Sequence, residues 1–66
     1  MKNSIKVERA RHNLTQGDLA EKVGVSRQTI NSIETKKYVP SAVLALKIAK
    51  VFQISFEELF QLEDDD

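Results

Sequence analysis

The chain has 66 residues, of which 41% are hydrophobic and 30% are charged, with no cysteine and a formal net charge of zero. This length allows one domain with a small core. The absence of cysteine excludes a disulfide, a thiolate nucleophile and a thiolate metal site. The longest unbroken apolar run, Ala42–Leu46, is too short to span a membrane, and residues 1–13 lack the apolar stretch of a signal peptide. We therefore expect a small cytoplasmic globular domain.

The zero net charge conceals an uneven distribution of charge along the chain. All ten Lys and Arg residues lie within residues 1–50, together with four acidic residues, whereas residues 51–66 carry six acidic residues and no basic one. This division suggests one end that approaches a polyanion and an acidic tail, residues 63–66, that stays away from it. The alternative is that this tail is only a solvated, frayed terminus.

The first two predicted helices follow from amphipathic periodicity and from the residues at their ends. A charged amphipathic segment over 5–12 ends at Asn13, a residue type that tolerates the left-handed conformation just past a helix. Thr15 and Asp18 resemble a capping box. They predict a second helix over 16–23.

Serine residues predict the starts of the remaining helices, because a serine hydroxyl accepts a hydrogen bond from the first turn. The expected helices are about 27–35 after Ser26, about 42–52 after Ser41 and about 56–62 after Ser55. Strand-like alternation is weak throughout. We therefore predict an all-α fold, a compact bundle of five helices.

The segment from Gln16 to Thr35, "QGDLAEKVGVSRQTINSIET", pairs two short helices around a three-residue connection. Gly24 makes the tight turn, since glycine adopts positive φ without strain. Val25 fills the turn, and Ala20 is small where two steeply crossing helices must approach. The inward apolar positions of the two helices are Leu19, Val23, Ile30 and Ile33. These offsets together predict a helix-turn-helix.

The stretch "LTQGDLAEKVGVSRQTINSIE" closely resembles the phage repressor and Cro-type helix-turn-helix of the XRE family. The following "PSAVLALKIAKVFQISFEELF" resembles that family's fourth and fifth helices, so the resemblance covers roughly residues 3–62. It implies a lambda-repressor-like bundle that binds double-stranded operator DNA as a homodimer and regulates transcription, without a cofactor. One departure is that the family usually closes its third helix with Glu-Asn-Gly-Lys, where this chain has "ETKK". If the helix ends there, Lys36 must adopt a left-handed conformation.

The third predicted helix has a polar face opposite Ile30 and Ile33. Amides on this face can match the donors and acceptors of the major groove, and an arginine can contact guanine or a phosphate. The resemblance assigns base contacts to Arg27, Gln28, Asn31 and Ser32. The alternative is a merely solvated face, which would usually carry Lys and Glu because they are better helix formers.

A second set of polar residues is expected to contact DNA phosphates. Gln16 opens the second helix, whose free N–H groups and dipole suit an anion. The family uses this glutamine for a phosphate contact, often while supporting an amide of the recognition helix. The whole expected set is Gln16, Ser26, Thr29, Lys36, Lys37 and Tyr38. The alternative for the lysines is simple solvation.

Arg9 and Glu34 are expected to be structural. In the family, residues at these positions form an ion pair. Such a partly buried pair would fix the first helix against the third, and removing one partner would strand a charge.

The C-terminal third carries more apolar residues than a monomer of this size needs to bury. Expected inward positions of the fourth helix are Ala42, Ala45, Ile48, Ala49 and Phe52. The surplus residues, proposed as a homodimer interface, are Val43, Leu44, Val51, Phe56 and Phe60. The alternative is that the fifth helix folds back over these residues.

Two other functional classes remain for comparison. A protein-interaction module of the same fold, such as an antitoxin, would normally need an additional segment to wrap its partner. An enzyme is disfavoured because no paired catalytic residues are present. The lone His12 has neither a cysteine nor a second histidine nearby to share a metal, and we infer no small-molecule ligand.

Overall fold

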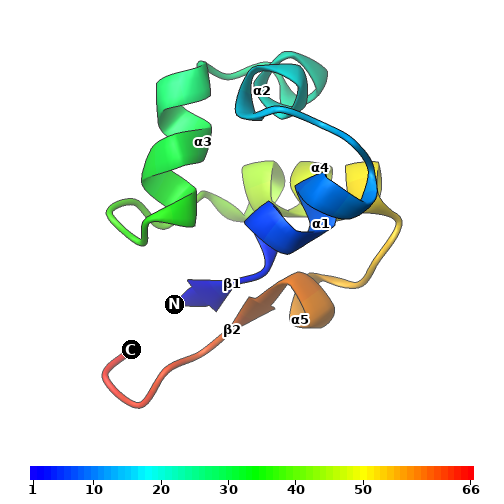
Figure 1. Ribbon diagram of the computed structural model, residues 1–66. Coiled ribbons are helices and arrows are strands. Elements are labelled where there is room, and N and C mark those ends of the chain that lie inside the picture. Colours follow the sequence, from blue (N-terminus) through cyan, green and yellow to red (C-terminus); the bar gives the residue numbers. More distant parts are fainter.

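The computed structural model describes all 66 residues and has seven short elements (Figure 1). In chain order these are β1 (Lys2–Asn3), α1 (Ile5–Arg11), α2 (Gln16–Val23), α3 (Arg27–Glu34), α4 (Ala42–Phe52), α5 (Phe56–Leu59) and β2 (Phe60–Gln61). The five predicted helices and the mostly helical fold are confirmed. None of the helices has the length and hydropathy that a bilayer-spanning segment needs.

A two-stranded sheet joins the two ends of the chain and was not predicted. β1 and β2 are antiparallel, with Lys2 opposite Gln61 and Asn3 opposite Phe60. The fifth helix, expected to reach residue 62, ends at Leu59 because Phe60 adopts extended backbone angles and begins β2. Figure 1 shows β1 and β2 side by side below α1, with both termini near each other.

The starts of α2 to α5 are fixed by side-chain caps, as predicted. The hydroxyls of Thr15, Ser26, Ser41 and Ser55 each accept a hydrogen bond from the backbone N–H three residues later. In α2 the carboxylate of Asp18 accepts in return from the Thr15 N–H, which completes the capping box. These bonds satisfy N–H groups that a helix start leaves unpaired.

Left-handed residues follow four of the helices, α1 to α4, and place the next element. Gly24 has φ 77° at the turn between α2 and α3, and Asn13 has φ 55° after α1, both as predicted. Lys36 has φ 64° just beyond the end of α3 at Glu34, so the helix does stop within "ETKK". Gln53 has φ 57° after α4, although its sequence context carried no signal for this conformation.

The core is one cluster of thirteen buried hydrophobic residues drawn from all five helices and β2. Its largest fully buried members are Ile5, Leu19, Ile30, Ile33, Ile48, Phe52 and Leu59. One expected inward residue, Ala42, is exposed at the first position of α4. The core holds α2 and α3 in fixed relative positions.

Two residues assigned to the expected dimer surface lie in this core instead. Leu44 is on the same side of α4 as Ala45 and Ile48, and Phe60 is turned inward by the start of β2. For these two residues the expectation does not hold. Val51 is half-buried against the core, while Val43 and Phe56 remain exposed.

Candidate nucleic-acid interface

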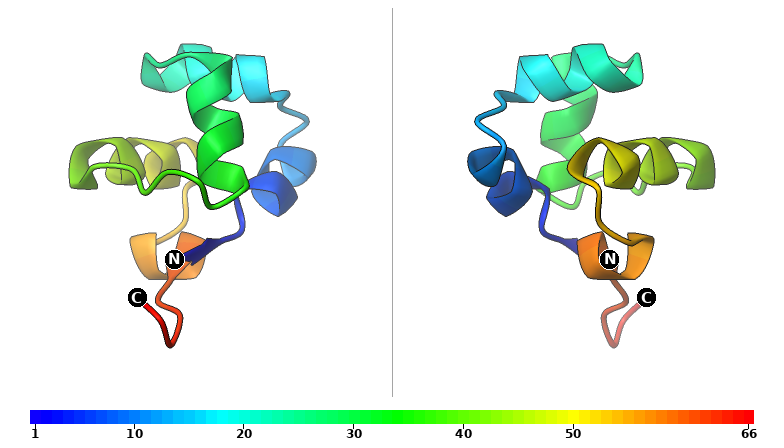
Figure 2. Two further views of the ribbon diagram at one scale, coloured as in Figure 1. Left: turned by 90° about the vertical axis from the view of Figure 1, so that its left-hand side faces the viewer. Right: turned by 90° about the vertical axis from the view of Figure 1, so that its right-hand side faces the viewer.

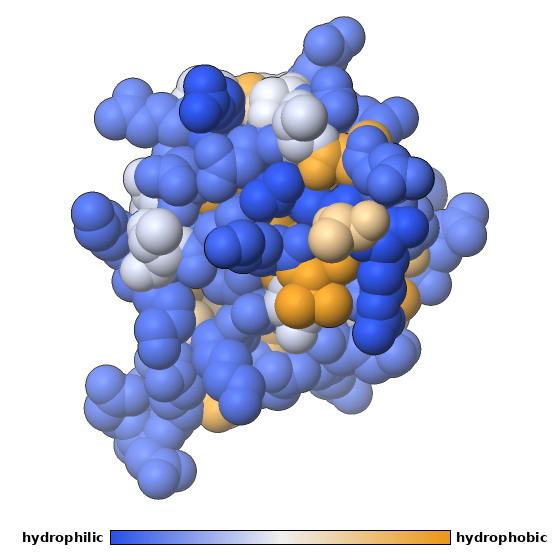
Figure 3. Space-filling model, in the orientation of Figure 1, coloured by the Kyte–Doolittle hydropathy of each residue, from blue (hydrophilic) through white to orange (hydrophobic).

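The helix α3 stands on one side of the molecule with a polar face turned outward. Figure 2 (left) shows α3 in front of the other helices. Ile30 and Ile33 are buried on its inner side, whereas Arg27, Gln28 and Asn31 are exposed on the outside. Figure 3 shows mostly hydrophilic surface on the side where α3 lies. The amides of this helix are therefore available to a partner molecule.

The polar side chains border two shallow depressions along α3. One is lined by Gln16, Arg27, Gln28 and Asn31, and the other by Ser26, Gln28, Thr29, Ser32 and Tyr38. Gln28 borders both depressions. All four expected base contacts and four of the expected phosphate contacts are thus brought together. Lys36 and Lys37 lie outside both depressions, just past the end of α3.

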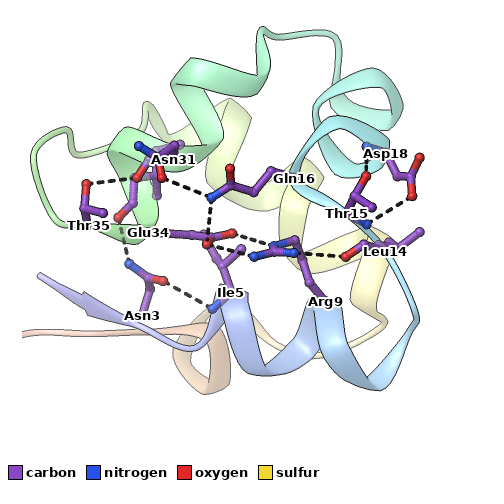
Figure 4. A network of polar contacts seen from close by, with 11 residues as sticks. Asn3, Ile5, Arg9, Leu14, Thr15, Gln16, Asp18, Asn31, Glu34 and Thr35 are labelled. Atoms are coloured by element: carbon purple, nitrogen blue, oxygen red, sulfur yellow. Dashed lines mark hydrogen bonds and ion pairs between the residues drawn. The ribbon is translucent and has the colours of Figure 1, made fainter.

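Gln16 joins the start of α2 to the exposed face of α3 (Figure 4). Its Nε2 donates to the Oδ1 of Asn31 at 3.1 Å and to the Oε1 of Glu34 at 3.2 Å. A carboxylate only accepts hydrogen bonds, so Glu34 fixes the amide of Gln16 with its NH₂ group inward. The second hydrogen of that NH₂ group then holds the oxygen of Asn31. As a result, the Nδ2 of Asn31 is the free donor of this pair.

The ion pair between Arg9 and Glu34 anchors that arrangement. Arg9 Nε donates to Glu34 Oε2 at 2.6 Å, and its Nη2 donates to Oε1 at 3.1 Å. The two side chains are only 15% and 7% exposed. The hydrogen bond from the Arg9 guanidinium to Glu34 raises the pKa of Arg9, while partial burial opposes that shift. The expected structural pair is present in the geometry and ties α1 to α3.

Ser26 and Thr29, both expected to contact phosphate, are already bonded to each other. The Ser26 hydroxyl caps α3 by accepting from the Thr29 N–H at 3.1 Å, and the two hydroxyl oxygens are 2.9 Å apart. Each hydroxyl oxygen has two lone pairs and one hydrogen. The bond between the two hydroxyls uses one of their two hydrogens, so the other hydrogen remains available to a phosphate oxygen.

Asn3 supports α3 from the first strand and was missed by the sequence interpretation. Its Nδ2 donates to the carbonyl oxygen of Ile33 at 3.0 Å, while its Oδ1 accepts from the N–H of Ile5 at 3.2 Å. The carbonyl groups of the last helical turn have no partner within the helix. Asn3 bonds one of them, the Ile33 carbonyl, which also accepts from the Lys36 N–H at 3.1 Å. Nothing in the local sequence pattern signals a contact across thirty positions.

The acidic tail is neither frayed nor remote from the residues expected to contact phosphate. The Nζ of Lys36 donates to both carboxylate oxygens of Glu63, at 3.0 and 3.1 Å. The Met1 amino group donates to the Oδ1 of Asp66 at 2.9 Å. The tail is therefore not a frayed terminus, because long-range pairing at the chain ends carries it back toward α3, although residues 64–66 are exposed. Where the tail lies relative to DNA stays a prediction.

Comparison with known proteins agrees with this arrangement of helices. The sequence profile of the Helix-turn-helix family matches residues 5–59, which include α1 to α5. The chain belongs to this family. Its members of the XRE type are DNA-binding transcriptional regulators and are not enzymes.

Relatives of this helix-turn-helix regulator occur in archaea and bacteria. An HTH-type transcriptional regulator of Methanocaldococcus jannaschii is 61% identical over 66 residues, covering the whole of both chains. The HTH-type transcriptional regulator YgzD of Bacillus subtilis is 50% identical, again over the whole of both chains. Among solved structures, the P22 c2 repressor in complex with a synthetic operator is similar, with a TM-score of 0.77. The two are 28% identical, and the match covers 80% of each chain.

Proposed function

We propose that this transcriptional regulator is a repressor that binds a palindromic operator as a homodimer, with α3 in the major groove. The observation that carries the proposal is the outward polar face of α3, held in place by the Gln16 amide. The similarity to the P22 c2 repressor, which was crystallised with an operator, supports the same use of this helix. No cofactor is required.

Within this proposal, Arg27, Gln28, Asn31 and Ser32 contact base edges. The free Nδ2 of Asn31 would donate to an acceptor in the major groove, such as N7 or O6 of guanine or N7 of adenine. Because the oxygen of Asn31 accepts from Gln16, the amide is oriented before DNA arrives. An oriented amide discriminates between bases at lower entropic cost than a free one.

The remaining polar residues would bind the DNA backbone and set the position of the domain. They are Gln16, Ser26, Thr29, Lys36, Lys37 and Tyr38. Such contacts supply affinity and salt dependence but no sequence information. The exposed apolar residues Val43 and Phe56, together with half-buried Val51, would form the contact between two copies.

The test begins with selection of the preferred duplex from a random library, followed by binding assays on that duplex and on a scrambled one. Gln28→Ala and Asn31→Ala should each cost about 1–3 kcal/mol on the preferred duplex and relax the preference at one base pair per half-site. Lys37→Ala should weaken both duplexes alike and lower the salt slope by about one ion per subunit. Half-sites should be about 34 Å apart, one helical turn.

Two results would count against the proposal. If Gln28→Ala and Asn31→Ala both left the preference for the selected duplex intact, α3 would not contact the bases. If no duplex were selected at all, a protein-interaction role such as that of an antitoxin would become the better interpretation. Capture of the same protein partner by the wild type and by both alanine variants would then support that role.

A further inference from the structure

The acidic tail is built into the fold at the C-terminal end of α3. Figure 2 (left), which views the molecule from the side of α3, shows the tail below the end of this helix. Residues 63–66 form a hydrogen-bonded turn: the Glu63 N–H donates to the Oδ2 of Asp66 at 2.7 Å, and the Asp66 N–H donates to the Glu63 carbonyl at 3.0 Å. The Met1 amino group holds this turn through Asp66.

The position of Glu63 is restricted by the residue that anchors the tail. Phe60 is 3% exposed and pairs with Asn3 in the sheet. Three residues span at most about 10 Å even when fully extended. Glu63 therefore cannot move far from α3 unless β2 leaves the sheet. A short tether of this kind gives its carboxylate a high effective concentration at Lys36.

The Lys36 ammonium group, which is expected to bind a DNA phosphate, is already paired with the Glu63 carboxylate. Both of its carboxylate oxygens accept from the Nζ of Lys36, much as two oxygens of a phosphate would. The hydrogen bond to Glu63 raises the pKa of Lys36, and the negative charges of Glu63, Asp65 and Asp66 add to that rise. A DNA phosphate that approaches this end of α3 meets a lysine that Glu63 has neutralised, and beside it the carboxylates of Asp65 and Asp66, of which Asp66 is paired with the Met1 amino group.

We propose that the acidic tail is an autoinhibitory segment whose Glu63 carboxylate competes with DNA phosphate for Lys36. This inference rests on the proposed function, because it assumes that α3 faces DNA. Binding to DNA would then require the tail to release Lys36. The penalty applies to the backbone contact, which supplies essentially all affinity for non-specific DNA. The tail would thus reduce the time that the regulator spends on random sequence.

The experiment measures the affinity of the full chain for a labelled random-sequence duplex at about 50 mM salt, where phosphate contacts dominate. Glu63→Gln should raise the affinity about two- to fivefold, the range that corresponds to a surface ion pair. The matched control is Asp64→Asn, because Asp64 belongs to the same tail and loses the same charge but forms no ion pair. It should raise the affinity by a smaller factor.

A Lys36→Gln background separates competition at Lys36 from the general field of the tail. In that background, Glu63→Gln should raise the affinity no more than Asp64→Asn does. If Glu63→Gln and Asp64→Asn raised the affinity equally in both backgrounds, the tail would act only through its long-range field. That result would refute the proposal, as would no effect of Glu63→Gln in the wild-type background.

A second measurement, made without DNA, tests the contact between Glu63 and Lys36 independently of whether α3 binds DNA. Titration of the Lys36 side chain by NMR without DNA should show a lower pKa in Glu63→Gln than in the wild type, because the carboxylate no longer stabilises the ammonium. An unchanged pKa would refute the tail contact itself. By contrast, failure of every variant to bind any duplex at low salt would refute the proposed function, whatever this titration shows.

Discussion

Replacement of Arg9 by methionine should be among the most damaging single changes outside the apolar core. The change leaves the Glu34 carboxylate, whose side chain is 7% exposed, with the Gln16 amide as its remaining hydrogen-bond donor. Loss of one partner from a fully buried pair costs about 3–5 kcal/mol, and loss of a surface pair costs at most about 1 kcal/mol. Arg9 itself is 15% exposed, so we expect a cost of about 2–3 kcal/mol between these limits.

The cost of Arg9→Met is large relative to the free energy of unfolding of so small a domain. At roughly 0.05–0.15 kcal/mol per residue, the whole chain is stable by about 3–10 kcal/mol. The melting temperature should therefore fall by about 10–20 °C. Circular dichroism during thermal and urea unfolding measures both quantities. The control is Lys6→Met, which removes an exposed charge from the same helix and should change the stability by less than about 0.5 kcal/mol.

The double replacement Arg9→Met with Glu34→Leu shows whether a stranded charge causes the loss. Two apolar side chains of similar volume leave no unpaired buried ion, so the double variant should recover most of the stability lost in Arg9→Met. If Arg9→Met cost no more than Lys6→Met, the pair would be an ordinary surface contact.

Three further outcomes are expected. Lys36→Gly should melt at a slightly higher temperature than Lys36→Ala, because both variants lose the ion pair to Glu63 and only glycine relieves a left-handed conformation that costs about 1 kcal/mol. A lower melting temperature for Lys36→Gly than for Lys36→Ala would mean that α3 continues through residue 36. Hydrogen bonds from Thr15 hold the pKa of Asp18 below its ordinary value, so this contribution to stability is present above about pH 3.9 and is lost as the pH falls further. In Asp18→Asn the free energy of unfolding should therefore fall less steeply with pH below about pH 3.9, and an unchanged slope would show that the capping box does not titrate. If the proposed homodimer forms through Val43, Val43→Glu should shift sedimentation from dimer to monomer without loss of helicity, since Val43 is 64% exposed, and an unaltered sedimentation coefficient would contradict a contact through Val43.

Much of the fold was accessible from sequence because its signals are local. A serine or threonine hydroxyl bonds a backbone N–H only three residues away, so Thr15 and Ser26 predict the starts of α2 and α3 from local sequence alone. Gly24 likewise needs only its own backbone angles to make the turn. The polar face of α3 follows from helical periodicity alone.

The features that sequence reasoning missed depend on contacts between distant segments. Strands of two residues have no alternation to detect, so the pairing of Asn3 with Phe60 left no periodic signal. That pairing reverses the expected roles of two residues: it turns Phe60 into the core and carries Glu63 to Lys36. The bond from Gln16 to Asn31 was implied only by the family resemblance, because it depends on how steeply α2 crosses α3, which the spacing of apolar residues does not determine.

The small sheet also has a consequence for the order in which the molecule folds and opens. Joining β1 to β2 closes a loop that contains nearly the whole chain, whereas α2 and α3 meet across a three-residue turn. Loop closure over so many residues costs more entropy, so the terminal ladder should form last and open first. Hydrogen exchange should accordingly find the amides of β1 and β2 less protected than those of α4. In such a partly opened state α2 and α3 remain intact while the chain ends, and Glu63 with them, are free to leave.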